Sequence, residues 1–289
     1  MSRVLVRSRS FEPSPPLREF VRVFRHLTTS ATPQLATRPI IARTGLVLTF
    51  NLHHGRGEAL DVHTSRRRIL PEILLTGAQY VRRTDIVMTT GWTSFSVHFN
   101  PAGVYRLFHM PVRPFTNRIV DAVEVLGPDL KQLHAQIRTA ATPSAMQRLV
   151  ESYLMKKVAD AAPLHPVARA AFKMLDRHGA MSIADASRAS GLGQRQFERC
   201  FIEQLGMPPK VYARVARLSF VLQRKTLNPS LDWTSIAGEA GYCDYKHLAR
   251  DFKAIVGASP TAYLSSPRRL DDGFLLPREP RKSKTVRRR

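Results

Sequence analysis

One pattern of about forty residues occurs twice near the C-terminal end of the chain, and a repeat of this kind fixes the unit of folding. An offset of 51 residues relates the later parts of the two copies, and an offset of 50 relates the earlier parts. The longer offset pairs Arg199 with Arg250, Phe201 with Phe252, Gly206 with Gly257, Pro209 with Pro260 and Tyr212 with Tyr263. We therefore expect two similar folded units within residues 182–265, with one extra residue in the second.

Each copy has the pattern of a helix-turn-helix unit. In the second copy, residues 232–240 predict a helix with Ser230 as N-cap and Asp232 in its acidic first turn. Gly241 tolerates the positive φ at which a chain reverses after a helix. The positions that define the following helices are Leu248, Phe252 and Ile255 on one face, Gly257 at the end, and Ser259 and Pro260 at the next start. The first copy repeats this plan with Gly191, Phe197, Phe201 and Gly206.

Two such units, joined by an apolar helix over residues 209–227, resemble the DNA-binding region of AraC-type transcriptional regulators. The matching residues of the second unit are Ile236, Ala237, Gly241, Tyr242, His247, Leu248, Arg250, Phe252, Lys253, Gly257, Ser259, Pro260 and Tyr263. The first unit departs from the family pattern at Ala186, Ser187 and Gly193. The resemblance implies a sequence-specific regulator with double-stranded promoter DNA as its partner. An unknown small-molecule effector, RNA polymerase and a second copy of the chain are its further candidate partners.

The two recognition helices carry the candidate DNA-binding residues. Their apolar positions face inward, and such a helix presents its N-terminal half to base edges in the major groove. The residues left outside are Gln194, Arg195, Glu198 and Arg199 in the first helix, and Tyr245, Lys246, Ala249 and Arg250 in the second, with His247 at the margin. Arginine can donate two hydrogen bonds to guanine, and glutamate can accept one from cytosine. A phosphate contact or a free surface charge is the alternative for each residue.

The helix over residues 209–227 is expected to hold the two units at a fixed separation. Five apolar side chains would be buried between the units: Val215, Leu218, Val221, Leu222 and Leu227. Four basic side chains on its other side would serve the DNA backbone: Arg214, Arg217, Arg224 and Lys225. Two recognition helices about 34 Å apart would meet successive major grooves on one face of B-DNA.

The chain before residue 142 has the short alternating runs of a β-rich domain. Strands are expected at residues 45–52, 73–76, 85–89 and 93–99, a helix or strand at 17–27, and a short helix at 104–110. In the run 93–99, Phe95, Val97 and Phe99 alternate with polar residues, as in a half-buried strand. AraC-type proteins carry a cupin-like sensor here, and residues 99–108 resemble a segment of one such subgroup. The expected fold class is α+β, with a cupin-like small β-barrel or sandwich before an all-α domain of two helix-turn-helix units.

Four segments follow from these patterns. They are a β-rich sensor or effector domain at 11–142, an amphipathic helix and linker at 143–166, the AraC-type double helix-turn-helix domain at 167–265, and a basic disordered tail at 266–289. Residues 1–10 are also expected to be disordered. The helix at 143–157 has one apolar stripe, formed by Met146, Leu149, Val150, Tyr153 and Leu154. Two interpretations of the stripe stay open: it packs on its own sensor domain, or it forms a dimer contact. Two also stay open for the tail at 266–289: it adds contacts to DNA phosphates, or it is a solvated tail without a function.

A net charge of +23 and a pI near 11.1 narrow the choice of partner. Such a surface attracts a polyanion, either nucleic acid or an anionic membrane, or serves solubility alone. No run approaches about eighteen apolar residues, so no transmembrane helix is expected. The first ten residues lack the apolar run of a secretory signal. Cys200 and Cys243 have no metal-binding spacing, which fits a reduced, cytoplasmic setting.

No cofactor, metal site or catalytic centre is expected. The histidines of the first half are His53, His54, His63, His98 and His109, with Asp61 and Glu72 as nearby acids, and none form a His-x-His pair. The sequence also lacks the spacing of a Ser-His-Asp, Cys-His or phosphate-loop arrangement. Two rival functions stay open. One is a cupin-like enzyme with a DNA-binding appendage, and the other is a packaging protein that binds DNA by charge alone.

Overall fold

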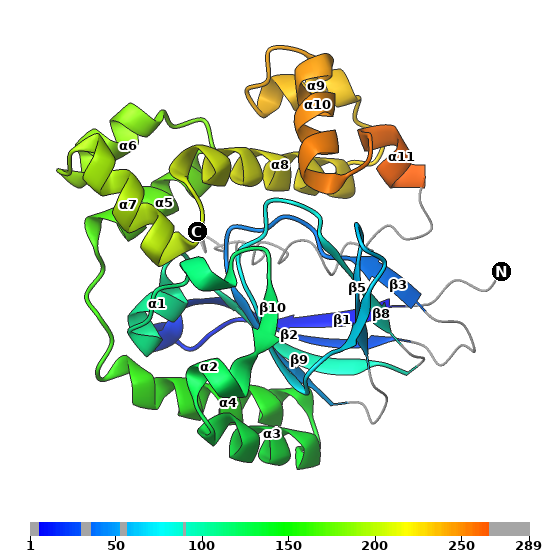
Figure 1. Ribbon diagram of the computed structural model, residues 1–289, viewed down its shortest axis with the longest axis vertical. Helices are drawn as coiled ribbons and strands as arrows, with labels where there is room; N and C mark the ends of the chain where they lie inside the picture. The colour runs from blue at the N-terminus through cyan, green and yellow to red at the C-terminus, as the bar shows by residue number, and fades with distance from the viewer. Residues whose placement is uncertain (1–5, 30–35, 53–56, 89–90, 266–289) are drawn as a thin grey trace, which may run out of the picture.

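The computed structural model describes residues 6–29, 36–52, 57–88 and 91–265. A β-rich half comes first and a helical half follows, and the two lie against each other (Figure 1). The larger sheet has the order β1 (Val6–Phe11), β2 (Val21–Thr29), β9 (Thr93–Phe99), β4 (Val47–Asn51), β7 (Ile73–Thr76) and β10 (Ile119–Asp121). The smaller sheet has the order β3 (Ala36–Pro39), β8 (Thr84–Met88), β5 (Glu58–Asp61) and β6 (Arg67–Ile69). All neighbouring strands are antiparallel.

Strand β9, near the middle of the larger sheet, is covered on both faces. Phe95, Val97 and Phe99 join the main apolar core, as their spacing predicts. Ser94 and Ser96 are also buried, because their face of the sheet is turned toward the smaller sheet across a cavity. The expectation of a half-buried strand is therefore wrong. Polar alternation indicates a face without apolar packing, and here that face lines a cavity instead of meeting solvent.

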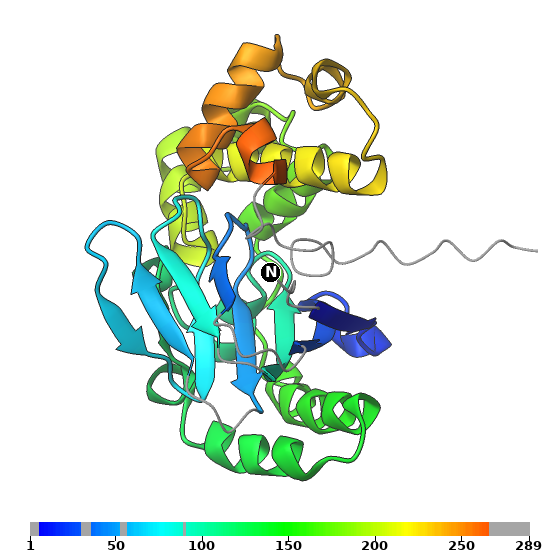
Figure 2. The ribbon, with the colours of Figure 1, turned by 90° about the vertical axis from the view of Figure 1, so that its right-hand side faces the viewer.

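Helices cover the other face of the larger sheet. They are α1 (Gly103–Phe108), α2 (Ala122–Leu126), α3 (Asp129–Thr139) and α4 (Pro143–Val158), with 3-10 turns η1 (Pro15–Leu17) and η2 (Arg113–Phe115). Met146, Val150 and Leu154 of α4 are buried in the core of the β-rich half. The apolar stripe thus packs on its own domain. Figure 2 shows α3 and α4 at the end of the molecule opposite the helical half.

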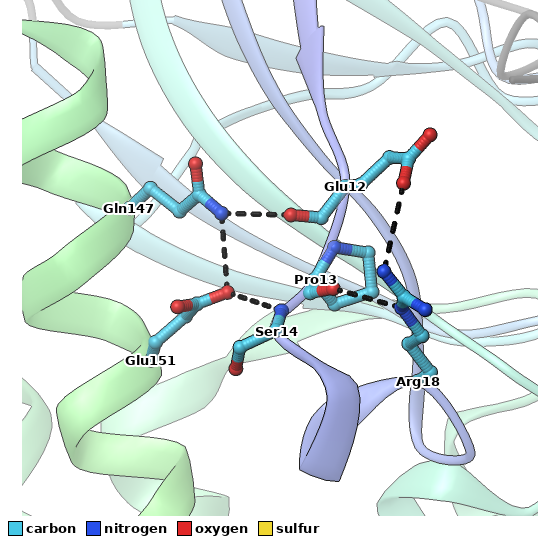
Figure 3. A network of polar contacts seen from close by, with 6 residues as sticks. All are labelled: Glu12, Pro13, Ser14, Arg18, Gln147 and Glu151. Atoms are coloured by element: carbon cyan, nitrogen blue, oxygen red, sulfur yellow. Dashed lines mark hydrogen bonds and ion pairs between the residues drawn. The ribbon is translucent and has the colours of Figure 1, made fainter. Parts of the chain in front are cut away.

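Polar contacts fix α4 to the N-terminal segment (Figure 3). The side-chain amide of Gln147 donates to the carbonyl of Glu12 at 2.8 Å. The backbone N–H of Ser14 donates to Oε1 of Glu151, also at 2.8 Å. Gln147 and Glu151 are one helical turn apart, so a single face of α4 forms both contacts. The same helix therefore combines an apolar and a polar attachment to the β-rich half.

The helical half consists of two units at the two ends of one long helix. The first unit contains α5 (Pro166–Asp176), α6 (Ile183–Ser190) and α7 (Gln194–Leu205), and the second contains α9 (Trp233–Glu239), α10 (Tyr245–Val256) and α11 (Pro260–Ser265). The joining helix is α8 (Pro209–Leu227), with the bounds that the sequence predicts. Phe197 and Phe201 lie in the first core, and Leu248 and Phe252 occupy the equivalent places in the second.

Helix α8 contributes to both cores, with one exception. Val215 belongs to the first core, and Leu218, Val221 and Leu222 belong to the second. Leu227 is 61% exposed, so the expectation that it is buried is wrong. It is the last residue of α8, and the three residues after it are exposed as well. The apolar pattern continues there past the end of the second unit's core.

Side-chain caps begin α9 and α10 but not α7. The carboxylate of Asp232 accepts hydrogen bonds from the N–H groups of Thr234 and Ser235 at the start of α9. Ser230 is therefore not the cap, and that expectation is wrong, because Asp232 already satisfies two of the open amides of the first turn. Asp244 caps α10, whereas α7 begins at Gly193 without a side-chain cap.

The two halves share apolar cores. Ile41, in the loop between β3 and β4, is 3% exposed and lies in the core of the second unit. Ala78, after β7, lies in the core of the first unit. The N–H of Val112 donates to the carbonyl of Glu203 at 2.9 Å, and the Thr116 hydroxyl donates to the carbonyl of Gly206. The β-rich half therefore contacts each helix-turn-helix unit separately.

The α+β fold class is confirmed, with a β-rich half followed by an all-α half. One expectation about its start is wrong, because Val6 to Ser10 belong to β1 and pair with β2. Residues 1–5 and the basic tail at 266–289 lie outside the described residues, so the expectations for them are not addressed. Among the described helices, none combines the length and the apolar character needed to cross a bilayer.

Candidate nucleic-acid interface

Helix α7 turns its candidate residues away from the core of the first unit. Gln194, Arg195 and Arg199 are exposed, and Glu198 is half-buried. Nε2 of Gln194 donates to Oε1 of Glu198 at 3.1 Å, so the carboxylate is held one turn along the same face. Arg195 and Arg199 are also one turn apart, and neither forms an ion pair with any described residue. The face thus offers two free guanidinium groups beside one positioned carboxylate.

Helix α10 presents a cation pair at the equivalent positions. Lys246 and Arg250 are exposed, and the 51-residue offset relates them to Arg195 and Arg199. Two further candidates contact their own unit: Tyr245 is half-buried against the second core, and the His247 ring packs edge-on against Tyr242. Ala249, directly before Arg250, is also half-buried. The second recognition helix therefore exposes its two cations more than its aromatic candidates.

The basic side chains of α8 are engaged within the protein. Nη2 of Arg214 lies 2.8 Å from Oδ1 of Asp251, Nε of Arg224 lies 2.6 Å from Oε2 of Glu239, and Nζ of Lys225 donates to the carbonyl of Leu231 at 2.6 Å. For these three residues, which hold the second unit on α8, the predicted role at the DNA backbone stays a prediction. Their role is to attach α10, α9 and the preceding loop to α8.

Arg217 completes this set by contacting both units. Its Nη2 donates to the carbonyl of Gly179, after α5, at 3.2 Å. Its guanidinium carbon also lies 5.1 Å from the ring centroid of Tyr242, in the second unit. Asp251 is buried, and its structural role was not predicted from the sequence. The available signal was an acidic residue directly beside the core residue Phe252.

A second group of basic residues, which the sequence did not predict, lies inside the β-rich half. No functional role was predicted for Arg25 or Arg43, and His98 was expected to be a polar residue of the strand at 93–99 and not a metal ligand. Burial, with Arg43 and Arg22 nearby, lowers the pKa of Arg25 to about 10. Burial also lowers the pKa of Arg43 to about 10. Burial and the charges of Arg25, Arg43 and Arg22 hold the pKa of His98 well below its ordinary value.

The residues considered for a metal site do not come together in the described part of the chain. His53 and His54 lie outside it, and His63 is exposed beside Asp61, whose carboxylate accepts a hydrogen bond from the backbone N–H of His63 at 2.9 Å. Within the described residues, no three His, Cys, Asp or Glu side chains form a group that could hold a metal ion. Cys200 and Cys243 are free thiols.

Two family models match the chain. A helix-turn-helix domain model, of the AraC type, matches residues 186–266, and a model of a domain of unknown function, DUF6597, matches residues 9–121. No curated protein matches the chain in sequence.

Among the solved structures that are similar to the chain, we name three. ToxT from Vibrio cholerae O395 is 9% identical over 90% of this chain and 96% of its own, with a TM-score of 0.47. The AraC-like transcriptional activator CuxR is 12% identical over 74% of this chain and 85% of its own, with a TM-score of 0.30. An RmlC-like cupin protein from Desulfovibrio desulfuricans is 14% identical over 34% of this chain and 82% of its own, with a TM-score of 0.24.

Two equivalent helix-turn-helix units, fixed to one helix and each exposing a cation pair, define a DNA-binding protein of the double helix-turn-helix class. The residue pattern of the second unit and the matching family model specify the type. The helical half of the chain carries a helix-turn-helix domain of the AraC type, the type found in transcriptional regulators.

Proposed function

We propose that α7 and α10 read promoter DNA in successive major grooves. The base-reading residues would be Arg195, Glu198 and Arg199 in α7 and Lys246 and Arg250 in α10, with Gln194, Tyr245 and His247 at their margins. The observation that carries this proposal is the exposure of equivalent cations on two helices that bury equivalent aromatic residues. Free guanidinium groups suit guanine O6 and N7, and the positioned Glu198 carboxylate suits cytosine N4.

The length of α8 supports simultaneous reading by both units. A helix of 19 residues spans about 28 Å at about 1.5 Å per residue. The units lie at its two ends (Figure 1). Successive major grooves on one face of B-DNA repeat about every 34 Å. The contacts of Arg214 and Arg217 would maintain this separation, because each of these α8 side chains ties a unit to the helix.

The β-rich half would act as the sensor in the cytoplasm, with a small-molecule effector as its ligand. Two of its loops reach the DNA-binding units through Ile41 and Ala78. These loops are joined to each other, because the N–H of Arg43 donates to the carbonyl of Gln79 at 2.8 Å and the N–H of Gln79 donates back at 2.9 Å. A shift of either loop would therefore pass to both units. RNA polymerase and a second copy are the further partners that the family type implies.

Arg199→Ala is expected to separate base reading from charge attraction. Sites would first be selected from a random DNA pool with the full chain, and affinities would then be measured on the selected site and on random DNA. Losing one base contact costs about 1–3 kcal/mol, which corresponds to about 5–150-fold in affinity. The loss on random DNA should be several times smaller, because only a general charge contribution disappears there.

Arg169→Ala provides the matched control, because Arg169 is an exposed arginine of α5 outside both recognition helices. It should weaken binding to both DNAs equally and by less than Arg199→Ala does on the selected site. Equal losses on both DNAs for Arg199→Ala, or a pool that yields no preferred sequence, would instead support binding by charge alone.

A further inference from the structure

Three basic side chains contribute to the lining of the cavity between the two sheets, and no acidic side chain of the described residues does so. Arg25 extends from β2, His98 from β9, and Arg43 from the loop before β4. In the pairing of β2 with β9, Arg25 lies opposite Ser96, two residues from His98 on the same face. The three side chains therefore gather at one region of the cavity wall.

Arg25 is the residue whose surroundings most require a partner. It is 3% exposed, and its Nε has no hydrogen-bond partner among the protein atoms of the described residues. Leaving a buried cation without a counter-charge is costly, and a buried N–H without an acceptor adds to that cost. The lowered pKa of Arg25 has the same origin, since burial and the neighbouring arginines all disfavour its charge. An anion in the cavity would relieve each of these penalties.

The rest of the cavity wall is apolar apart from a few neutral polar groups. Its apolar residues are Leu27, Ile40, Val47, Leu74, Ile86, Met88 and Trp92. The volume of the cavity that is open to a water-sized sphere is about 70 Å³, whereas one water needs about 10–15 Å³ of such space. The space thus admits a ligand of only a few non-hydrogen atoms. An apolar wall of this kind favours a ligand that has a short hydrocarbon part in addition to its charge.

We propose that this cavity binds a small organic anion, a short-chain carboxylate, whose charged group meets Arg25 and Arg43 and whose chain meets the apolar wall. A carboxylate has the two planar acceptors that a guanidinium group binds in pairs. Inorganic phosphate would match the charge but would leave the apolar wall without a partner. The carboxylate is therefore the anion that the whole lining fits.

Arg43 connects this site to the contacts between the two halves. Its Nε donates to the carbonyl of Ile41 at 3.5 Å, and Ile41 occupies the core of the second unit. Arg43, Val47 and His98 also line the cleft between the β-rich and helical halves. Anion binding at Arg43 would thereby act on the loop that contacts the DNA-binding domain. This regulatory step rests on the proposed sensing function, whereas the binding itself does not.

Calorimetric titration of the full chain with propionate tests the site. Propionamide has the same shape without the charge, and inorganic phosphate has charge without the chain. Propionate should bind at least tenfold more tightly than either. Arg25→Gln should lower the propionate affinity at least tenfold, whereas Arg83→Gln removes one charge from an exposed position of the same half and should leave it unchanged. Should Arg25→Gln fail to fold, Arg43→Gln replaces it, with an expected loss of at least threefold, because Arg43 is the second residue that meets the carboxylate.

Several outcomes would overturn the proposal. They are equal binding of propionate and propionamide, tighter binding of phosphate than of propionate, and an equal effect of the Arg25 and Arg83 substitutions. Affinity for the selected DNA site, measured with and without saturating propionate, tests the regulatory step separately. Propionate binding that leaves DNA affinity unchanged would support the site and overturn its role as the effector site.

Discussion

Gly179→Ala should destabilise the protein far more than a glycine-to-alanine change usually does. Gly179 follows α5 with φ of +75°, and a Cβ there would lie 2.1 Å from the carbonyl oxygen of Ala213 in α8. That atom belongs to helix backbone, so relief requires α5 to move away from α8. The left-handed conformation costs about 1–2 kcal/mol for a non-glycine residue, and forced overpacking adds about 1–3 kcal/mol. Denaturant unfolding of the variant measures the total.

Gly191→Ala is the matched control for this prediction. Gly191 has φ of +70°, and, its chain neighbours aside, no atom of the described residues lies within 4 Å of the Cβ position. This variant therefore bears the conformational cost of about 1–2 kcal/mol without the clash. Gly179→Ala should also reduce affinity for the selected DNA site, because it displaces the first unit relative to α8. Equal stability losses in the two variants would show that α5 and α8 can separate freely at this point.

Ile41→Asp should detach the second unit from the β-rich half while the first unit stays attached. Ile41 is 3% exposed among apolar residues that include Leu222 and Phe252. An ionised carboxylate buried there without a partner is strongly unfavourable, so the loop should leave the core. Amide hydrogen exchange then measures the result. Exchange in α9 and α10 should become at least tenfold faster, because their shared core opens to water.

Two internal comparisons control the Ile41 experiment. Exchange in α7 should change little, since its contacts with the β-rich half come from Ala78, Val112 and Thr116. Ile69→Asp introduces the same charge at a position that is 56% exposed and should leave exchange in the helical half unchanged. If α9 and α10 exchange at the normal rate in Ile41→Asp, the second unit does not depend on this contact.

Local patterns in the sequence were sufficient to predict most of the helices and turns of the helical half. The bounds of α8 follow from Pro209 at its start and the apolar spacing behind it, and the C-terminal turns follow from Gly206 and Gly257 in the left-handed conformation. Strands β7 and β9 were predicted residue for residue, because alternation and turn residues are also local signals. The cap of α9 was misplaced by two residues, since Ser230 and Asp232 are both good caps by residue type.

Features that depend on contacts between residues far apart in the sequence could not be predicted from local patterns. Nothing periodic marks Ile41 or Ala78 as members of cores that lie more than a hundred positions further along the chain. Arg25 and His98 became neighbours only through the pairing of β2 with β9. The basic residues of α8 were correctly placed on its surface, but a surface position does not reveal whether the partner is DNA or protein. The base-reading roles proposed for Arg199 and Arg250 stay predictions.

Ile41 and Ala78 of the β-rich half complete the cores of the helical half, and this affects how the protein can be divided into fragments. A fragment that begins after residue 160 would keep every helix of the DNA-binding domain yet lack one wall residue from each of its two hydrophobic interiors. Apolar surface that is buried in the full chain would then be exposed to water, and such patches favour self-association. Isolated domains are thus poor substitutes for the intact protein. The β-rich half and the helical half are better regarded as one cooperative folding unit.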